Sequence, residues 1–374
     1  MITPFDDFPI HQTPEPIAQP ATGDRNVYDR YFFNGYRADG SLFFAAAWGL
    51  YPNRSVQDAA FSVVRDGVQT SVHGSRRAPL DRVDMRVGPI TVEVLEPLRR
   101  LRVVVAPNDA GIEADLTFTR VTDALEEPRF TRYAGTRKIM DYTRLTQFGT
   151  WSGHVVVEGE RIEITPDTFV GSRDRSWGIR NIGERDGGAP PTALPQFFWL
   201  WSPIVFDDAC VHFDVQEDGD GRRWHQNGAI APRFAADDDG NGDGDGGTAV
   251  DHAVDVSWEI DWRPGTRRAG RAAIDLTMLG GEIHRIELEP LVDFQMLGIG
   301  YFHPEFSHGS WVGEEAVGVG RWKLDELDPT ELHHLHVQAL CTARWGDRVG
   351  TGVLEQLAIG PHAPSGFAGL NDGA

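Results

Sequence analysis

The sequence RIEITPDTFVGSRDRSWGIR, which spans Arg161 to Arg180, joins an alternating apolar run to a dense group of charged and aromatic side chains. Ile162 and Ile164 alternate with polar residues before Pro166, a pattern typical of a strand that enters a turn. The polar part contains three arginines, an acid, a hydroxyl, an indole and a glycine: Arg173, Asp174, Arg175, Ser176, Trp177, Gly178 and Arg180.

Two interpretations fit this arginine-rich segment. Arginine forks pair with carboxylates in a fixed geometry, so the segment can join parts of the fold, line the floor of a polar pocket, or do both. Ion-pair networks resemble functional sites in their charge pattern. We therefore prefer a structural Arg/Asp/Trp corner between two sheets over a catalytic role.

Strand patterns with turn signals continue on both sides of this segment. The run LFFAAAW (42–48) is apolar, and Ile112 to Arg120 alternates cleanly. Asp66-Gly67 and Glu158-Gly159 each separate two short apolar runs, which predicts hairpins. Few stretches have a helical period, so the sequence predicts a large antiparallel β protein, either a sandwich or a barrel.

A second informative run is QFFWLWSPIVFDDACVHFDV, residues 196–215, which is rich in aromatic residues and includes Trp199 and Trp201. Asp208, His212 and Asp214 share one parity, so on an unbroken strand they would point to one face. Such a face is either the wall of a polar cavity or the solvent side of an edge strand.

The length of 374 residues favours two domains over one core. We expect an extended, proline-rich arm (1–26), an N-terminal module (27–235), an acidic disordered insert (236–250) and a C-terminal module (251–367). The insert contains the start of a calcium-loop pattern, but Val250 stands where the closing glutamate belongs. A solvated hairpin tip is the simpler interpretation.

The formal net charge of −21 argues against nucleic acid as a partner, because such a surface repels phosphate backbones. The N-terminus lacks the basic start and apolar run of a signal peptide, and no apolar stretch approaches transmembrane length. The two cysteines, Cys210 and Cys341, lie in apolar runs and are expected to be buried thiols. These features predict a cytoplasmic protein.

The sequence contains no nucleotide-binding loop, nucleophile elbow, CxxC pair or HExxH motif. His303, Glu305 and His308 form a loose set of possible metal ligands, but such spacing on a loop is permissive, and we expect neither metal nor cofactor. A cavity in which histidines lie beside acids and tryptophans would suit the binding and protonation of an apolar ligand. Aromatic faces stabilise a developing carbocation, and an acid with a raised pKa delivers the proton.

The sequence resembles the double-lipocalin superfamily of carotenoid 1,2-hydratase (hydroxyneurosporene synthase), especially its uncharacterised actinobacterial-type branch. The resemblance spans most of residues 27–367, and SRDRSWG is its most specific part. It is carried by VGSRDRSWGIR (170–180), FFWLWSPIVFDDACVHF (197–213), DGDGRRWHQNG (218–228) and GVLEQLAIGPHAPSGF (352–367).

The resemblance implies two lipocalin-like β-barrel or open-barrel modules with a pocket for an apolar ligand. It also implies a cofactor-independent enzyme for a lipophilic, isoprenoid-like molecule, with hydration of a C=C bond as the leading reaction. Fold transfers between relatives better than reaction does. Two alternatives remain: a non-catalytic carrier of a hydrophobic molecule, and a structural or interaction module.

In the hydratase hypothesis, Asp174 or Asp208 donates the proton, and His212 or His303 positions water or relays protons. Arg173, Arg175 and Arg180 hold the acid. The apolar ligand lies against tryptophans, namely Trp177, Trp199, Trp201 and Trp311.

Overall fold

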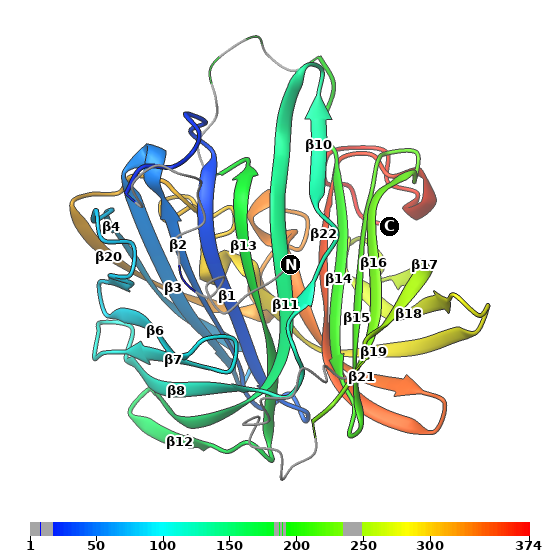
Figure 1. Ribbon diagram of the computed structural model, residues 1–374, viewed down its shortest axis with the longest axis horizontal. Coiled ribbons are helices and arrows are strands. Elements are labelled where there is room, and N and C mark those ends of the chain that lie inside the picture. The colour runs from blue at the N-terminus through cyan, green and yellow to red at the C-terminus, as the bar shows by residue number, and fades with distance from the viewer. Residues whose placement is uncertain (1–7, 9–17, 183–186, 188, 190–191, 235–248) are drawn as a thin grey trace. The chain divides into compact units, whose positions relative to one another are not determined.

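The computed structural model describes residues 8, 18–182, 187, 189, 192–234 and 249–374. It divides into two compact units, which we call unit 1 (Met1–Asp186 with Leu297–Lys323) and unit 2 (Gly187–Met296 with Leu324–Ala374). Both are built of antiparallel strands, which confirms the predicted all-β fold class of two lipocalin-like modules (Figure 1). Most of the predicted N-terminal arm and acidic insert, with its calcium-loop pattern, lie outside the described residues.

Unit 1 is a 14-stranded sheet that curls into a nearly closed barrel, with the order β20-β4-β3-β2-β1-β13-β11-β8-β7-β6-β5 and with β9, β10 and β12 paired to β11. The strands are β1 (Val27–Arg37), β2 (Phe43–Tyr51), β3 (Val56–Arg65), β4 (Val68–Arg77), β5 (Arg86–Val87), β6 (Ile90–Glu96), β7 (Arg100–Val105), β8 (Ile112–Arg120), β9 (Leu125–Glu126), β10 (Phe130–Ala134), β11 (Arg137–Val157), β12 (Glu160–Ile164), β13 (Phe169–Arg180) and β20 (Glu315–Lys323).

Unit 2 is a closed barrel of the strands β14-β15-β16-β17-β18-β19-β21-β22. These are β14 (Phe197–Val205), β15 (Ala209–Glu217), β16 (Arg223–Pro232), β17 (Asp251–Trp262), β18 (Ala269–Met278), β19 (Ile283–Gln295), β21 (Val337–Trp345) and β22 (Arg348–Ile359).

The described helices are short 3-10 turns: η2 (Pro52–Arg54), η3 (Met296–Ile299), η4 (Leu324–Glu326), η5 (Leu332–His334) and η6 (Ala363–Ser365). No helix in the described part of the chain is both long enough and apolar enough to cross a membrane.

The division between the units differs from the predicted modules 27–235 and 251–367 in two places. The first boundary lies near residue 187, because β14 pairs with β22 and so closes the second barrel. In the sequence, the acidic insert lies between β16 and β17, two strands of that barrel that pair with each other. In addition, residues 297–323 leave the second barrel and add β20 to β4 of unit 1. Strand pairing across long sequence separations, which composition does not show, sets these boundaries.

Both units have a dense apolar interior. In unit 1 the inward-facing core includes Phe33, Phe44, Phe118 and Trp151, whose rings meet edge to face around the Trp151 indole. In unit 2 alternate residues of each strand fill the barrel, among them Phe213 and Ile274. The two cysteines, Cys210 and Cys341, are buried free thiols, as expected.

The predicted hairpins are confirmed. β3 and β4 join at Asp66-Gly67, where φ is 50° and 73°, and β11 and β12 join at Glu158-Gly159, where φ is 54° and 82°. Two consecutive left-handed residues give the turn that matches the twist of an antiparallel pair, and Asp-Gly and Glu-Gly place glycine at the second position.

The segment rich in arginine lies on β13, in the middle of the unit 1 sheet between β1 and β11. Arg175 is fully buried and forms an ion pair with Asp29, which is also buried. Its guanidinium also donates to the backbone carbonyl of Arg30 at 3.1 Å and lies 4.3 Å from the ring centroid of Tyr31. This arrangement supports the structural interpretation of the segment for Arg175.

Replacing Arg175 by Met is expected to lower the free energy of unfolding of unit 1 by about 3–5 kcal/mol, because the Asp29 carboxylate would remain buried without its cation. The matched control is Arg161→Met, which removes the exposed Arg161–Glu163 pair and should change stability by less than about 1 kcal/mol. Equilibrium denaturation in urea measures both. Equal small effects for the two variants would contradict the structural role of Arg175.

Candidate functional site

The predicted site residues fall into both units. Unit 1 holds Arg173, Asp174, Arg175, Trp177, Arg180, His303 and Trp311, and unit 2 holds Trp199, Trp201, Asp208 and His212.

Arg173 and Arg175 do not hold Asp174 in the manner that we expected. Their strand positions oppose Phe33 and Tyr31 of β1, so both side chains share the core face of the sheet. Arg173 donates from Nε to the side-chain oxygen of Gln147 at 2.9 Å. Asp174 lies at the intervening position and therefore points to the opposite face, where it is half-buried. The alternation of a strand separates the acid from the flanking arginines.

Asp208 was predicted to share a strand face with His212 and Asp214. Instead, it precedes β15 in an exposed turn and forms an ion pair with Arg348 at 3.2 Å. A turn residue is not bound by the alternation of the strand, which explains the difference. His212 and Asp214 lie within β15 and are both buried.

The outward face of β14 and β15 in unit 2 is aromatic and polar. The Trp199 indole N–H donates to Asp214 at 2.9 Å, and the other oxygen of Asp214 lies 3.1 Å from His225 Nε2. Trp201 meets the ring of His212 edge to face at 6.2 Å between centroids. Because these side chains are buried and β15 pairs with a strand on each side, this face is not the solvent side of an edge strand.

A polar cluster that sequence reasoning missed lies on the outward face of unit 1. Arg30 of β1, Gly49 of β2 and Asp58 of β3 occupy directly opposite positions on adjacent strands. A Cβ at Gly49 would lie 2.6 Å from the hydroxyl of Tyr51 and 2.9 Å from Asp58 Oδ1. The missing side chain therefore makes room for a contact between the two polar groups.

Residues 297–314 cover this face, and we call them the covering segment. Gly298 approaches β3 and β4 so closely that a Cβ there would lie 2.5 Å from Ser62 Oγ and 2.9 Å from Ser71 Oγ. Further along, the carbonyl of Ser310 accepts a hydrogen bond from Ser75 at 3.4 Å. The segment also contributes His308 and the backbone N–H of Gly309 to the cluster.

The cluster is a connected hydrogen-bond network. Nη1 of Arg30 donates to the Tyr51 hydroxyl at 3.2 Å and to His308 Nδ1 at 2.7 Å. Because arginine has no acceptor, His308 must accept through Nδ1 and carry its proton on Nε2 when neutral. Tyr51 donates to Asp58 Oδ1 at 3.4 Å, and Gly309 N–H donates to Oδ2 at 2.7 Å.

Burial sets the protonation of the acid. Desolvation raises the pKa of Asp58 from 3.8 to about 6, although Arg30, Gly309 and Tyr51 each lower it. Desolvation also raises the pKa of Tyr51, with the charge of Asp58 adding to the effect. Asp58 is thus a carboxyl group that exchanges its proton near neutral pH, which suits general acid or base catalysis.

A small cavity adjoins the acid. Its lining combines the polar side chains of Asp58, His73, Ser75 and His308 with apolar residues such as Ala59, Ile299 and Phe306, and the space open to a water molecule is about 10 Å³. A cavity of this size with polar groups in its wall is at the lower limit for holding one water. The arrangement therefore combines a titratable carboxyl group with a partly polar space of one-water size.

Arg180, one of the site residues predicted from the sequence, lies at the border of the Asp58 cluster. Its guanidinium lies 4.8 Å from the ring centroid of Tyr28 and 5.8 Å from that of Tyr301, and Arg30 lies 5.2 Å from Tyr301. Desolvation raises the pKa of Tyr28 to about 12, even though Arg180 lowers it. Tyr28 therefore stays neutral beside the Arg180 guanidinium.

Two histidines lie next to the cavity. The rings of His73 and His303 are 4.6 Å apart, and burial together with His303 lowers the pKa of His73 to about 3. His303 Nδ1 accepts from the backbone N–H of Glu305 and of Phe306, at 3.2 and 2.9 Å. The Arg30 cation at His308 disfavours a metal ion there, so the loose ligand set in the sequence does not fit a metal site.

The remaining predicted residues of unit 1 lie at its margins. Trp311 is 43% exposed and packs against the guanidinium of Arg77 at 4.8 Å. Trp177 is half-buried, with Arg175 5.9 Å from its ring. Neither position lines the cavity at Asp58.

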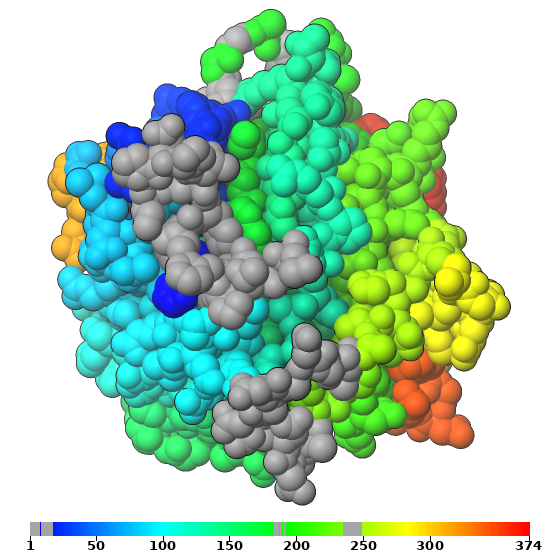
Figure 2. Space-filling model, in the orientation of Figure 1, coloured from blue at the N-terminus to red at the C-terminus, as the bar shows by residue number. Residues whose placement is uncertain are grey.

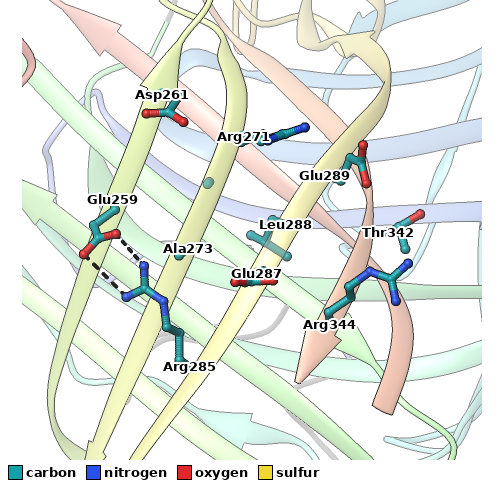
Figure 3. Close-up of a pocket in the computed structure, with 11 residues that line it drawn as sticks. Glu259, Asp261, Arg271, Ala273, Arg285, Glu287, Leu288, Glu289, Thr342 and Arg344 are labelled. Atoms are coloured by element: carbon teal, nitrogen blue, oxygen red, sulfur yellow. Dashed lines mark hydrogen bonds and ion pairs between the residues drawn. The ribbon is translucent and has the colours of Figure 1, made fainter. Parts of the chain in front are cut away.

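A groove of about 310 Å³ lies on the outside of unit 2, across β17, β18, β19 and β21 (Figure 3). Charged side chains line it, and opposite charges occupy directly opposed strand positions, as in Asp261–Arg271 and Glu287–Arg344. Arg285 binds Glu259 and lowers its pKa. We interpret the groove as a solvated charge ladder that stabilises the barrel.

The one sequence signal for Asp58 was an acid within the buried run VQDAAFSVV (56–64). The partners of Asp58 are far apart in sequence: Gly309 is 251 residues from Asp58, and His308 is 278 residues from Arg30. No local motif could have joined them.

The fold resembles that of solved proteins. An AttH-type protein from Nitrosomonas europaea has a TM-score of 0.56 at 16% identity, over 88% of this chain and 92% of that one. Kievitone hydratase from Nectria haematococca has a TM-score of 0.50 at 12% identity, over 88% of each chain. These identities show a shared fold alone, which agrees with the double-lipocalin resemblance.

No functionally curated protein matches the sequence. A family model does match it, over residues 2–368, and therefore over nearly the whole chain. The chain belongs to that family, the family of unknown function DUF8625.

Proposed function

We propose that this protein is an enzyme that adds water to a C=C bond of a lipophilic, isoprenoid-like small molecule, with Asp58 as general acid. The observation that carries the proposal is the buried Asp58 carboxyl group beside a partly polar cavity of one-water size. The fold shared with kievitone hydratase supports the choice of hydration, and the resemblance to carotenoid 1,2-hydratase supports the isoprenoid class.

In this reaction protonated Asp58 transfers its proton to one alkene carbon, and the electron pair of the double bond forms the new C–H bond. The cation that develops on the other carbon is attacked by a water molecule held in the cavity. The water then returns a proton to the Asp58 carboxylate, which restores the acid. The balance is one alkene plus one water to one alcohol, so the reaction requires no cofactor.

The surrounding groups fit these steps. Gly309 N–H and the Tyr51 hydroxyl bind the Asp58 carboxylate after proton transfer, and Arg30 stabilises its charge. The neutral His308 carries its proton on Nε2, where it can donate to a water and orient it.

The carrier alternative requires a large internal cavity, as lipocalin-type barrels have. The interior of the unit 2 barrel is instead filled by apolar side chains, including Phe198, Phe213 and Leu354. This packing argues against a ligand-binding cavity inside the unit 2 barrel.

Asp58→Asn is expected to lower the hydration rate by about a hundredfold or more, because the amide cannot donate the catalytic proton. The wild-type rate should fall as pH rises through about 6, since the protonated acid is the active form. The assay incubates the protein in heavy-oxygen water with a lipid extract of its source cells and with prenylated and polyene compounds, and detects labelled alcohols by mass spectrometry.

The acids that the sequence favoured serve as comparison variants in this assay. Asp208→Asn should keep activity because Asp208 is an exposed turn residue. Asp174→Asn tests a half-buried acid on the same outward face of the sheet. Full activity in Asp58→Asn together with its loss in Asp174→Asn or Asp208→Asn would transfer the role of proton donor to that residue.

Stability should also depend on Asp58. Since folding raises the pKa of this carboxyl group, the folded state binds more protons than the unfolded state between pH 4 and 6, and stability falls as pH rises across that range. The shift corresponds to about 3 kcal/mol between its limits. Urea denaturation of wild type and Asp58→Asn at several pH values measures the difference, which should shrink in the variant. Parallel curves would mean that the acid titrates normally.

Gly298→Ala is expected to displace the covering segment from β3 and β4, because its Cβ would lie 2.2 Å from Gln69 Nε2 and 2.5 and 2.9 Å from the Ser62 and Ser71 hydroxyls. These three side chains bind one another in a buried network. Water would then reach Asp58, and its pKa should fall toward 3.8. The matched control is Gly313→Ala in the same segment, where the nearest atom to a Cβ is 3.7 Å away. Carbon NMR titration of the aspartate carboxyl groups, assigned with Asp58→Asn, measures the pKa of Asp58 in both variants. Identical titrations would contradict the role of the covering segment in excluding water from Asp58.

A further inference from the structure

The strand β20 (Glu315–Lys323) forms an edge of the unit 1 sheet, next to β4 in Figure 1 and near the left margin of Figure 2. Among the described strands, β4 is the one to which it is hydrogen-bonded. An edge strand presents a row of backbone N–H and C=O groups that another strand can pair with.

This edge lacks most of the features that protect edges from pairing. It is nine residues long, contains no proline, and places its single lysine, Lys323, at the end. Exposure alternates along it, and the exposed positions include Val317 and Val319, which are 49% and 53% exposed. The glycines at positions 318 and 320 add no bulk on the other face.

The sequence of β20, EAVGVGRWK, is self-complementary in antiparallel orientation. About a two-fold axis at Val319, the opposed positions are Glu315 with Lys323, Ala316 with Trp322, Val317 with Arg321, and Gly318 with Gly320. The register thus forms two opposite-charge pairs by symmetry and places the two Val319 side chains directly opposite each other at the axis.

We propose that β20 pairs with β20 of a second copy of this chain, in this register, and joins two unit 1 sheets into one. A pair of identical edges is an isologous contact, which closes as a dimer. Pairing of β20 with the opposite edge of the sheet, at β5, would be heterologous and would leave open ends.

The contacts of β20 within its own chain are compatible with this pairing. Glu315 lies 3.9 Å from Arg86, and both side chains are more than half exposed, so the pair contributes little and can be exchanged. Arg321 forms an exposed ion pair with Glu158 in the β11–β12 turn, which holds the strand end in place.

Charge reversal tests the register. Sedimentation velocity of the full chain over a concentration series should show a monomer–dimer equilibrium. Glu315→Lys should weaken it about tenfold, because the introduced lysine would face Lys323 of the other copy at both ends of the strand pair, and Lys323→Glu should act similarly. The double variant Glu315→Lys/Lys323→Glu should restore wild-type dimerisation, which a loss through misfolding would not do.

Val319→Lys, with two lysines at the axis, should weaken the dimer by at least about tenfold. Val349→Lys is the matched control, since Val349 is 55% exposed on β22 of the other unit. A wild-type protein that stays monomeric, a dimer unaffected by Val319→Lys, or a double variant that fails to recover would each overturn the proposal. Concentration-dependent filaments would also overturn it, in favour of pairing between β20 and β5.

Discussion

The ion pair between Arg175 and Asp29 fixes the register of β1 against β13, and the faces of unit 1 depend on that register. Two charged groups can be buried away from water only when they form an ion pair with each other. A shift of one residue would place Arg30 in the apolar interior and Tyr31 outside it, because strand side chains alternate. The Arg175–Asp29 ion pair, which holds the two strands together, therefore also directs the Arg30 side chain outward into the polar cluster.

Opposed effects set the proton affinity of Asp58. Burial raises its pKa, and the nearby Arg30 charge with two hydrogen-bond donors lowers it, so that the result lies near neutral pH. A more exposed carboxyl group would remain ionised, and one without the guanidinium would hold its proton too strongly. The chemistry of the site rests on this balance, which β1, β3 and the covering segment maintain jointly.

The sequence predicted those features that local patterns encode. Asp66-Gly67 and Glu158-Gly159 identified hairpins because two left-handed residues suffice to define the turn. The alternation in Ile112–Arg120 identified β8, since one face meets the core. The structural interpretation of the arginine segment on β13 fits Arg175, although its partner Asp29, on a distant strand, had no signal in the sequence.

The remaining features depend on pairings between distant segments. The unit boundaries differ from the predicted ones because β14 pairs with β22, and residues 297–323 cross from one unit to the other. Asp208 was misplaced because the strand begins one residue after it. Asp58 was missed because its environment comes from β1, β2 and a segment some 250 residues later, and no periodicity records such proximity.

The late position of residues 297–323 in the chain has a consequence for biosynthesis. Strands β1–β13 are synthesised before β20 and the covering segment, so the first sheet has β4 as a bare edge while residues 181–314 are being made. During that interval the Asp58 cluster is open to water, and contacts of this sequence separation form slowly. The β4 edge is open to pairing during that interval, and Asp58 would acquire its raised pKa only after residues 297–314 have been synthesised.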